Sequence, residues 1–322
     1  MFSQKDRELR KAVNRQSRFI LIYTLLFLFG TVLGMFILNW NVIWSQNAPT
    51  DEVMNLLFNQ QSGALGLIAL AVGMLFVLLK RRKKLFQVDL RAAPEAPKKT
   101  MSARVFLSCI VLLFSAQLLY VLVDLGVRAA AQQLGYTMFS AMDSLDAAET
   151  TGAMLLYAGF LGPVVEEILF RGTILRGLEQ YGKLFAIGTS AILFGLFHGD
   201  FVQGIFAMAC GLVFGYLALE YSIRWAIALH VFNNFLLSIV LDGCLDLLPG
   251  QLQGPVQTVL IVGIGAVGGL WVLLRHRRAL AEYCRTNKLP RRTYLVGWTS
   301  VWFLLFLVLQ VASACSSFTR IS

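Results

Sequence analysis

The stretch that decides the fold is FILIYTLLFLFGTVLGMFIL, residues 19–38, in which no residue is charged. A helix needs about 20 such residues to cross the hydrocarbon core of a bilayer. No water is available there, so a helix that pairs its own N–H and C=O groups is the stable form. Basic residues precede the stretch and Asn39-Trp40-Asn41 follows it, with no small-residue cleavage site. We therefore expect a retained membrane helix rather than a removed signal peptide.

Similar apolar segments recur along the chain. Of its 322 residues, 57% are hydrophobic and 14% are charged, whereas about a quarter of the residues of a soluble domain are charged. This composition argues against a soluble enzyme with a large core. We predict an all-α polytopic membrane protein with about nine transmembrane helices. Their expected ranges are 19–38, 62–79, 105–125, 151–170, 184–198, 202–221, 225–241, 256–274 and 294–313.

The basic residues predict how these helices are oriented. The net charge is +10, but Lys and Arg gather at segment ends, as in Lys80–Lys84 and Arg275–Arg278. Cytoplasmic loops carry such an excess, so we predict a cytoplasmic amino terminus and, after nine crossings, a carboxyl terminus outside. Anionic lipid head groups are the expected partners of the basic clusters, and nucleic acid is not. The expected location is a bacterial cell membrane. The predicted outer loops contain Asp51, Glu52, Asp143, Asp146, Glu149, Asp242 and Asp246.

Smaller features complete this organisation. The segment Asp89–Lys99, with three alanines and two prolines, is typical of a cytoplasmic linker. The five cysteines form no Cys-x-x-Cys pair, and we expect free thiols or apolar fillers. Pairs of glycines spaced by four positions would allow helices to approach closely, although glycine is common in membrane helices. These pairs are Gly30/Gly34, Gly211/Gly215 and Gly265/Gly269.

The fourth segment ends in ionisable residues, in the stretch Gly162-Pro163-Val164-Val165-Glu166-Glu167-Ile168-Leu169-Phe170-Arg171-Gly172. Charged groups within a membrane are costly and are usually functional. Glu167 and Arg171 lie four residues apart and should pair on one helix face. Glu166 is rotated by about 100° from Glu167. If it is desolvated without a cation, its pKa should rise and it should exchange protons near neutral pH. The alternative is that both glutamates cap a helix end.

Two of the three histidines also lie in apolar segments. Phe194 and His198 share a face of the fifth segment, so the phenyl ring can fix the imidazole. His230 and Asn234 share a face of the seventh segment and can hold a water or an oxyanion. The alternative is a structural hydrogen-bonded pair between helices. The third histidine, His276, lies in a basic cluster, and we expect no catalytic role for it.

Taken in order, these residues resemble the three motifs of the CPBP family, which are Glu166-Glu167-x-x-x-Arg171, Phe194-x-x-x-His198 and His230-x-x-x-Asn234. The family includes type II CAAX prenyl endopeptidases and bacterial bacteriocin-processing or self-immunity (Abi) proteins. The resemblance implies an intramembrane endopeptidase of the glutamate type, a class formerly described as metalloproteases. It divides the chain into accessory helices with a cytoplasmic loop (1–150), a catalytic core (151–241) and two further accessory helices (242–322).

The resemblance also implies a role for each side chain. Glu166, helped by His198, would deprotonate the water that attacks the scissile carbonyl. His230 and Asn234 would stabilise the oxyanion. Glu167 and Arg171 would form a supporting pair, and Phe194 would pack against the site.

A zinc site is the rival interpretation. Glu166, His198 and His230 can form a two-histidine, one-carboxylate set with an open position, but the His-Glu-x-x-His helix of zinc proteases is absent. We expect no cofactor. The predicted depths conflict, since Glu166 and His230 lie near cytoplasmic ends and His198 lies roughly 21 Å into its segment. The fifth segment would then have to be tilted, broken or begin later.

Two other functions stay open. The same Glu and His residues would serve a transporter or proton relay, although such proteins often show internal repeats, and none is evident. A catalytically silent immunity or scaffold protein would bind a partner in the membrane. For a peptidase, the substrate is a peptide or membrane protein; a prenylated CAAX peptide, a bacteriocin leader and a signalling-peptide precursor all fit.

Overall fold

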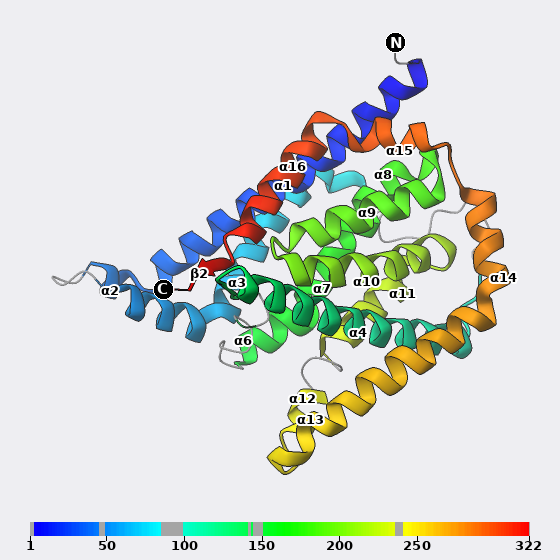
Figure 1. Ribbon diagram of the computed structural model, residues 1–322. Coiled ribbons are helices and arrows are strands. Elements are labelled where there is room, and N and C mark those ends of the chain that lie inside the picture. The colour runs from blue at the N-terminus through cyan, green and yellow to red at the C-terminus, as the bar shows by residue number, and fades with distance from the viewer. Residues whose placement is uncertain are drawn as a thin grey trace.

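The computed structural model describes residues 3–44, 49–84, 99–140, 143, 151–235 and 241–321, and these are mainly helical (Figure 1). Most of the predicted linker Asp89–Lys99 and the predicted outer residues Asp146 and Glu149 lie outside the described residues. In chain order the elements are α1 (Gln4–Leu38), α2 (Trp40–Ile43), α3 (Asp51–Lys84), α4 (Ala103–Gln133), β1 (Tyr136–Met138), α6 (Gly152–Met154), η2 (Leu155–Leu161), α7 (Gly162–Glu167), η3 (Ile168–Leu175), α8 (Arg176–Leu178), η4 (Glu179–Tyr181), α9 (Lys183–Phe197), α10 (Phe201–Glu220), α11 (Ile223–Val231), α12 (Leu241–Leu245), α13 (Gly250–Val259), η6 (Leu260–Gly268), α14 (Gly269–Asn287), α15 (Arg291–Trp298), α16 (Val301–Cys315) and β2 (Phe318–Arg320).

The predicted all-α polytopic membrane fold is confirmed, but the count of nine spans is not. Six helices in the described ranges are long and apolar enough to cross a bilayer, or seven if the bent pair α15–α16 is one span. The fifth predicted segment is the 15-residue α9, and the seventh begins with the nine-residue α11. The ninth is broken between α15 and α16, which meet at 70°. The six spans are Gln4–Leu38, Asp51–Lys80, Ala103–Gln133, Gly152–Tyr181, Phe201–Glu220 and Gly250–Asn287.

The predicted glycine pairs lie where two helices approach each other closely. A Cβ added at Gly30 of α1 would lie 2.7 Å from the Cα of Ala69 in α3. At Gly211 of α10 it would lie 3.1 Å from the Cα of Ala191 in α9, and at Gly265 of η6 it would lie 2.6 Å from a backbone oxygen of α4. Larger side chains would push these backbones apart, so the small residues permit the packing. The expected close approach is confirmed at all three pairs.

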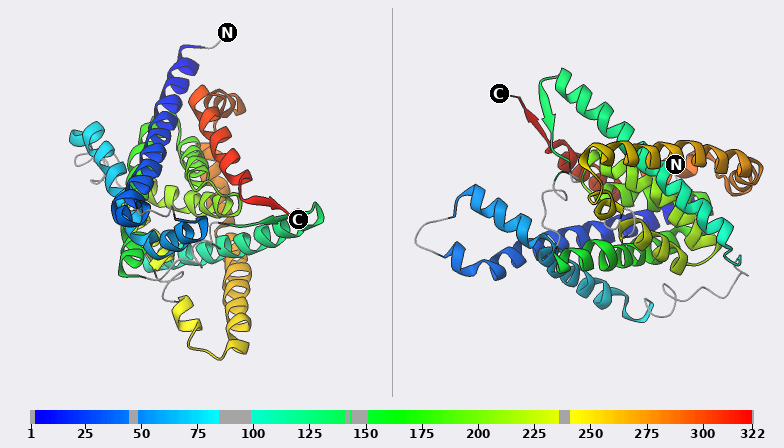
Figure 2. Two further views of the ribbon diagram at one scale, coloured as in Figure 1. Left: turned by 90° about the vertical axis from the view of Figure 1, so that its left-hand side faces the viewer. Right: turned by 90° about the horizontal axis from the view of Figure 1, so that it is seen from below.

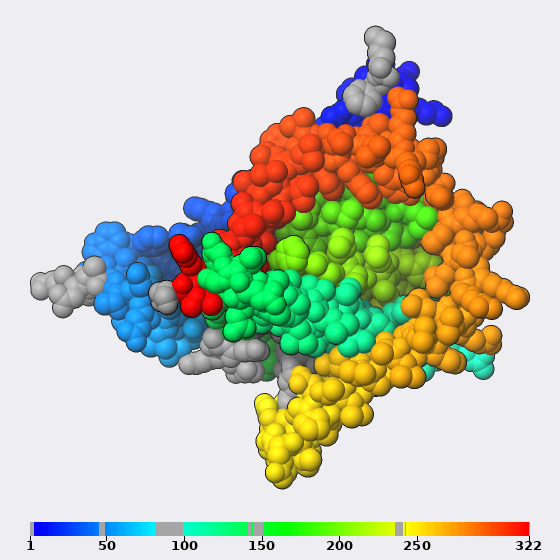
Figure 3. Space-filling model, in the orientation of Figure 1, coloured from blue at the N-terminus to red at the C-terminus, as the bar shows by residue number. Residues whose placement is uncertain are grey.

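The helices of 152–181 form the centre of the molecule together with α9, α10 and α11. Their side chains supply much of the buried core, including Phe170, Leu193, Phe214 and Leu229. Helix α1 packs against α15 and α16, while α4 packs against η6 and α14. Figure 1 shows α9 and α10 between these two groups, and Figure 3 shows the green surface of the central helices framed by them. The accessory helices therefore surround the predicted core.

Polar contacts join helix ends that the sequence predicts to be cytoplasmic. Glu220, at the end of α10, accepts hydrogen bonds from Lys183 Nζ (2.7 Å) and from the Tyr283 hydroxyl (3.0 Å). Near the amino terminus, Arg292 donates to Asp6 across 2.9 Å. The predicted topology puts both residues of each contact on the same side of the membrane, as residues in contact must be.

A second junction is a small antiparallel sheet, here called the β clasp, made of 136–138 and 318–320 (Figure 2). Thr137 pairs with Thr319, and their hydroxyls are 2.8 Å apart. Beside it, Arg128 of α4 donates to Asp143 Oδ2 across 2.9 Å. Burial raises the pKa of the Asp143 carboxyl, but hydrogen bonds from the Ser140 backbone and from Arg128 outweigh it and hold that pKa below its usual range. The β clasp ties the end of α4 to the end of α16, both of which are predicted to lie outside.

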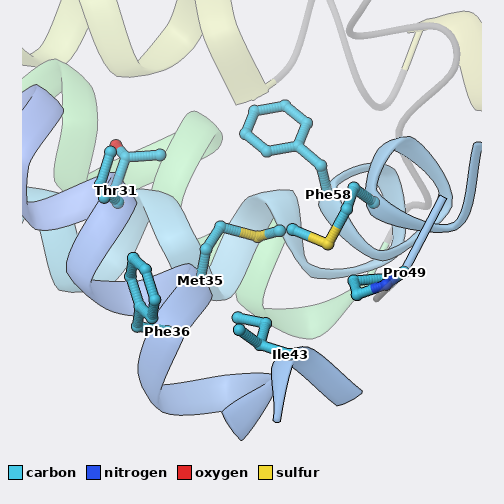
Figure 4. A pocket seen from close by; sticks show the side chains of 8 residues that line it. Thr31, Met35, Phe36, Ile43, Pro49 and Phe58 are labelled. Atoms are coloured by element: carbon cyan, nitrogen blue, oxygen red, sulfur yellow. The ribbon is translucent and has the colours of Figure 1, made fainter. Parts of the chain in front are cut away.

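An apolar pocket of about 440 Å³ lies between α1 and α3, near α2. Met35 and Phe36 of α1, Ile43 of α2 and Phe58 of α3 line it (Figure 4). None of the predicted catalytic residues lines this pocket. It is therefore not the candidate reaction site.

Native cysteines provide a test of the predicted topology. We expect a membrane-impermeant maleimide, added to right-side-out vesicles, to label the exposed Cys244 and Cys315 but not the exposed Cys284. The reason is that the distribution of basic residues predicts Cys284 on the cytoplasmic side and the other two cysteines outside. Chains that keep one cysteine each are compared by mass shift, and the buried Cys210 should react only after unfolding. Labelling of Cys284 before permeabilisation would overturn the topology.

Candidate functional site

The two adjacent glutamates lie in the middle of a long helix that can cross a membrane. The helix runs from Gly152 to Tyr181, so Glu166 is near the midpoint of 30 residues. The helix continues past residue 170, where the membrane segment was predicted to end, and α9 begins at Lys183, as expected. Two π-helical stretches, η2 and η3, flank α7 and form one continuous helix with it. Such turns occur frequently at functional sites.

Glu167 and Arg171 form the expected ion pair, and it is completely buried. Glu167 Oε1 lies 2.8 Å from Arg171 Nη1, and both side chains are 0% exposed. Arg171 Nη2 also donates to the carbonyl of Gly211 in α10 (3.3 Å). The guanidinium carbon lies 4.4 Å from the ring centroid of Phe194 and 5.2 Å from that of Phe214. These aromatic faces attract the cation most where water is excluded, so the charge has partners on several sides.

His230 lies between the two glutamates. Its Nδ1 is 2.9 Å from Glu167 Oε1, and its Nε2 is 3.6 Å from Glu166 Oε2. A carboxylate accepts hydrogen bonds, so Nδ1–H donates to Glu167 and Nε2 is directed to Glu166. Two acceptors that face each other in this way can hold one proton between them. The site therefore contains a place for a mobile proton beside a partly exposed carboxylate.

Phe214 is a site residue that the motifs do not reveal. Its ring stacks on His230 with centroids 4.7 Å apart and planes at 23°. It also covers the Arg171 guanidinium. The helix that carries it, α10, contains no motif residue, and a phenylalanine in an apolar helix resembles ordinary core in the sequence. Only the fold reveals that it touches both groups.

His198 follows the last residue of α9 and joins the site through Phe194. Its Nδ1 lies 2.9 Å from the Phe194 carbonyl oxygen. The Phe194 ring meets His198 edge-on at 5.0 Å and His230 at 5.7 Å, so the expected contact with His198 extends to both histidines. From α16, the Gln310 side chain donates to the carbonyl of Phe197 across 3.3 Å. The imidazole is thus held at Nδ1 by the Phe194 carbonyl, and among the described residues no protein group bonds to its Nε2.

Asn234 differs from its expected arrangement. Its side-chain nitrogen donates to the carbonyl of Ala158 in η2 (3.1 Å), and its side-chain oxygen accepts from Asn233 (3.0 Å). Residues 232–235 are π-helical, so a spacing of four no longer puts Asn234 one α-helical turn from His230. No hydrogen bond joins Asn234 to either histidine in the described part of the chain. The hydrogen bond to Ala158 links the end of α11 to the fourth segment. The second N–H of the Asn234 side-chain amide can still donate to a substrate.

The rival zinc set is not assembled in this structure. Among the described residues, no group of three His, Cys, Asp or Glu side chains is arranged to hold a metal ion. Glu166 and His230 face each other directly, whereas His198 reaches them through the Phe194 ring. The donor atoms are of kinds that zinc accepts, but their arrangement is not that of a common ligand shell.

Comparisons with known proteins match the region of the chain that contains these residues. The family model for the Rce1-like type II CAAX prenyl endopeptidases matches residues 148–236. A protein of Bacillus subtilis (strain 168) named "Putative membrane peptidase YdiL" is 29% identical over 122 residues, which are 37% of this chain and 49% of that protein. The chain thus aligns with about half the length of this curated relative. No solved structure matches the chain. The resemblance to the CPBP family, which the three motifs predict, is therefore confirmed over residues 148–236.

Proposed function

We propose that this chain is an intramembrane endopeptidase in which Glu166 activates the water that cleaves a peptide bond. The observation that carries the proposal is the placement of His230 between two glutamates in different surroundings. Glu167 is fully buried and pairs with Arg171, whereas the Glu166 side chain is 23% exposed. One carboxylate is thus structural, and the other is open to a substrate. The match to the CAAX prenyl endopeptidase family supports this reading.

The mechanism assigns one proton path. Glu166, assisted by His198, takes a proton from water as its oxygen bonds to the scissile carbonyl carbon. The proton passes from Glu166 to His230 Nε2, and the resulting imidazolium and the amide N–H of Asn234 stabilise the oxyanion. When the C–N bond breaks, the proton returns through Glu166 to the leaving amine. The bridge from Glu167 to His230 Nδ1 supports this division of roles, because it fixes the tautomer whose Nε2 is directed to Glu166.

The other two functions make different demands on the same residues. A proton-coupled transporter would use Glu166 and His230 without breaking a bond. An immunity or scaffold protein would need neither side chain to be chemically active. The family match favours a peptidase over both, and substrate turnover separates them. A prenylated CAAX peptide, a bacteriocin leader and a signalling-peptide precursor are the substrates to compare.

The decisive experiment tests purified protein in detergent on a peptide library that contains farnesylated and unmodified members. We expect Glu166→Gln to lower the cleavage rate by about 10²-fold or more, because an amide keeps the shape but cannot take a proton from water. Thermal stability should stay close to that of the wild type. The control is Glu179→Gln, which alters a glutamate of the same segment that pairs only with Arg176 in this region. Near-normal cleavage by Glu166→Gln would sink the proposal.

Glu167→Gln should act on stability instead. It leaves the guanidinium of Arg171 buried without its counter-charge, and breaking such a pair costs about 3–5 kcal/mol. Adding Arg171→Met should restore part of this loss, because a buried apolar side chain needs no partner. Unfolding in detergent is measured for the three chains. A double variant no more stable than Glu167→Gln alone would contradict the structural role of the pair.

Metal dependence can be tested on the same preparation. We expect cleavage to survive chelators and purified protein to lack stoichiometric zinc. The opposite result would be about one zinc per chain that is lost on His198→Ala and on His230→Ala. That outcome would favour the zinc mechanism over the glutamate mechanism.

A further inference from the structure

Two tyrosines from different parts of the chain lie next to residues that contact the candidate site. Tyr23 belongs to α1, outside the family-matched region, and is 2% exposed. Tyr157 belongs to η2 and is half-buried. Tyr157 immediately precedes Ala158, whose carbonyl accepts a hydrogen bond from Asn234. Two phenols that the three motifs do not include therefore lie next to residues that contact the candidate site.

Helix α3 is shaped to hold both rings. A Cβ added at Gly73 would lie 2.6 Å from a ring carbon of Tyr23, and one at Gly66 would lie 2.6 Å from a ring carbon of Tyr157. The two glycines are seven residues, or about two helical turns, apart, so they share one face of α3. By contrast, a Cβ at Gly126 of α4 would meet nothing within 4 Å. The glycines of α3 thus provide the space that the two rings occupy.

Tyr23 also lies near the second motif. Its ring centroid is 6.0 Å from that of Phe197, which is in turn 6.0 Å from that of His198. Helix α1 therefore approaches the site from the side of His198.

The hydroxyl groups have no evident structural use. In the described residues neither phenol forms a hydrogen bond with another protein group. Neither hydroxyl is among the fully enclosed polar atoms that lack a partner, so each keeps some open surface. Placing a hydroxyl in apolar surroundings without a partner is unfavourable. A phenylalanine would fill the same space without this cost, so packing explains the rings but not the hydroxyls.

A substrate supplies the missing partners. The backbone of a peptide that enters an apolar site brings carbonyl groups that need hydrogen-bond donors. Glu166 is an acceptor when ionised, and the Asn234 amide is partly engaged. Phenols are donors that carry no charge, and they stay protonated at neutral pH.

We propose that the hydroxyls of Tyr23 and Tyr157 bind backbone carbonyl groups of the peptide substrate beside the scissile bond. The inference rests on the proposed peptidase function. It gives α1 and α3, which lie outside the family-matched region, a part in substrate binding. It also accounts for the two glycines of α3, which let the rings lie against that helix.

The test uses the full-length protein in detergent and the library peptide that the wild type cleaves fastest. Tyr23→Phe and Tyr157→Phe should each raise KM about 3–10-fold, the value of one lost hydrogen bond, while kcat changes less than about twofold and thermal stability is kept. Binding of the same peptide to the Glu166→Gln chain should weaken equally when either tyrosine is changed. A merely structural role would lower stability and leave KM unchanged.

Matched controls separate the hydroxyl from the ring. Tyr120→Phe removes a phenol of α4 whose ring contacts Phe206 and no site residue that the structure describes, and it should leave KM unchanged. Gly73→Ala keeps the Tyr23 hydroxyl but displaces its ring and should also raise KM, whereas Gly126→Ala should not. An unchanged KM in both phenylalanine variants overturns this inference and leaves the peptidase intact. Absence of cleavage by the wild type overturns the proposed function, and the inference falls with it.

Discussion

The buried pair of Glu167 and Arg171 is the constraint on which the rest of the site depends. Removing two charges from water costs several kcal/mol for each ion, so the pair depends on its close partners. Gly211 leaves the space, since a Cβ there would lie 3.1 Å from the guanidinium. Glu167 Oε1 binds Arg171 and His230 at once. A single oxygen atom thus links the fourth segment to α11 and sets the orientation of the His230 imidazole.

What could be predicted from the sequence is what helix geometry alone determines. The spacing of four was sufficient for the pair of Glu167 and Arg171 and for the contact of Phe194 with His198. Irregular helix was not predictable, because π-helical turns change the number of residues per turn without a sequence signal. They extend the fourth segment beyond residue 170 and redirect Asn234. Hydropathy also does not separate α9, buried among other helices, from a helix that spans the bilayer alone.

Helices outside the family-matched region pack against the residues of the site. Helix α1 lies against α3 through Gly30 and against the site through Tyr23, and α16 contributes the Gln310 hydrogen bond next to His198. Interiors are close-packed, so a shift in one of these outer helices is passed on to the side chains it touches. The helices outside the motifs therefore help to fix the positions of the motif-bearing helices relative to one another.

The β clasp has a consequence for the order of biosynthesis. Thr137 and Thr319 are 182 positions apart, and ribosomes add about 5–20 residues each second, so the two strands emerge roughly 10–40 s apart. Helix α16 emerges immediately before the second strand and brings Gln310 to the turn at Phe197. A nascent chain thus already carries all three motifs while it still lacks the helix that braces His198. The hydrogen bond between Gln310 and the Phe197 carbonyl therefore forms only after α16 has been synthesised and has packed against α9.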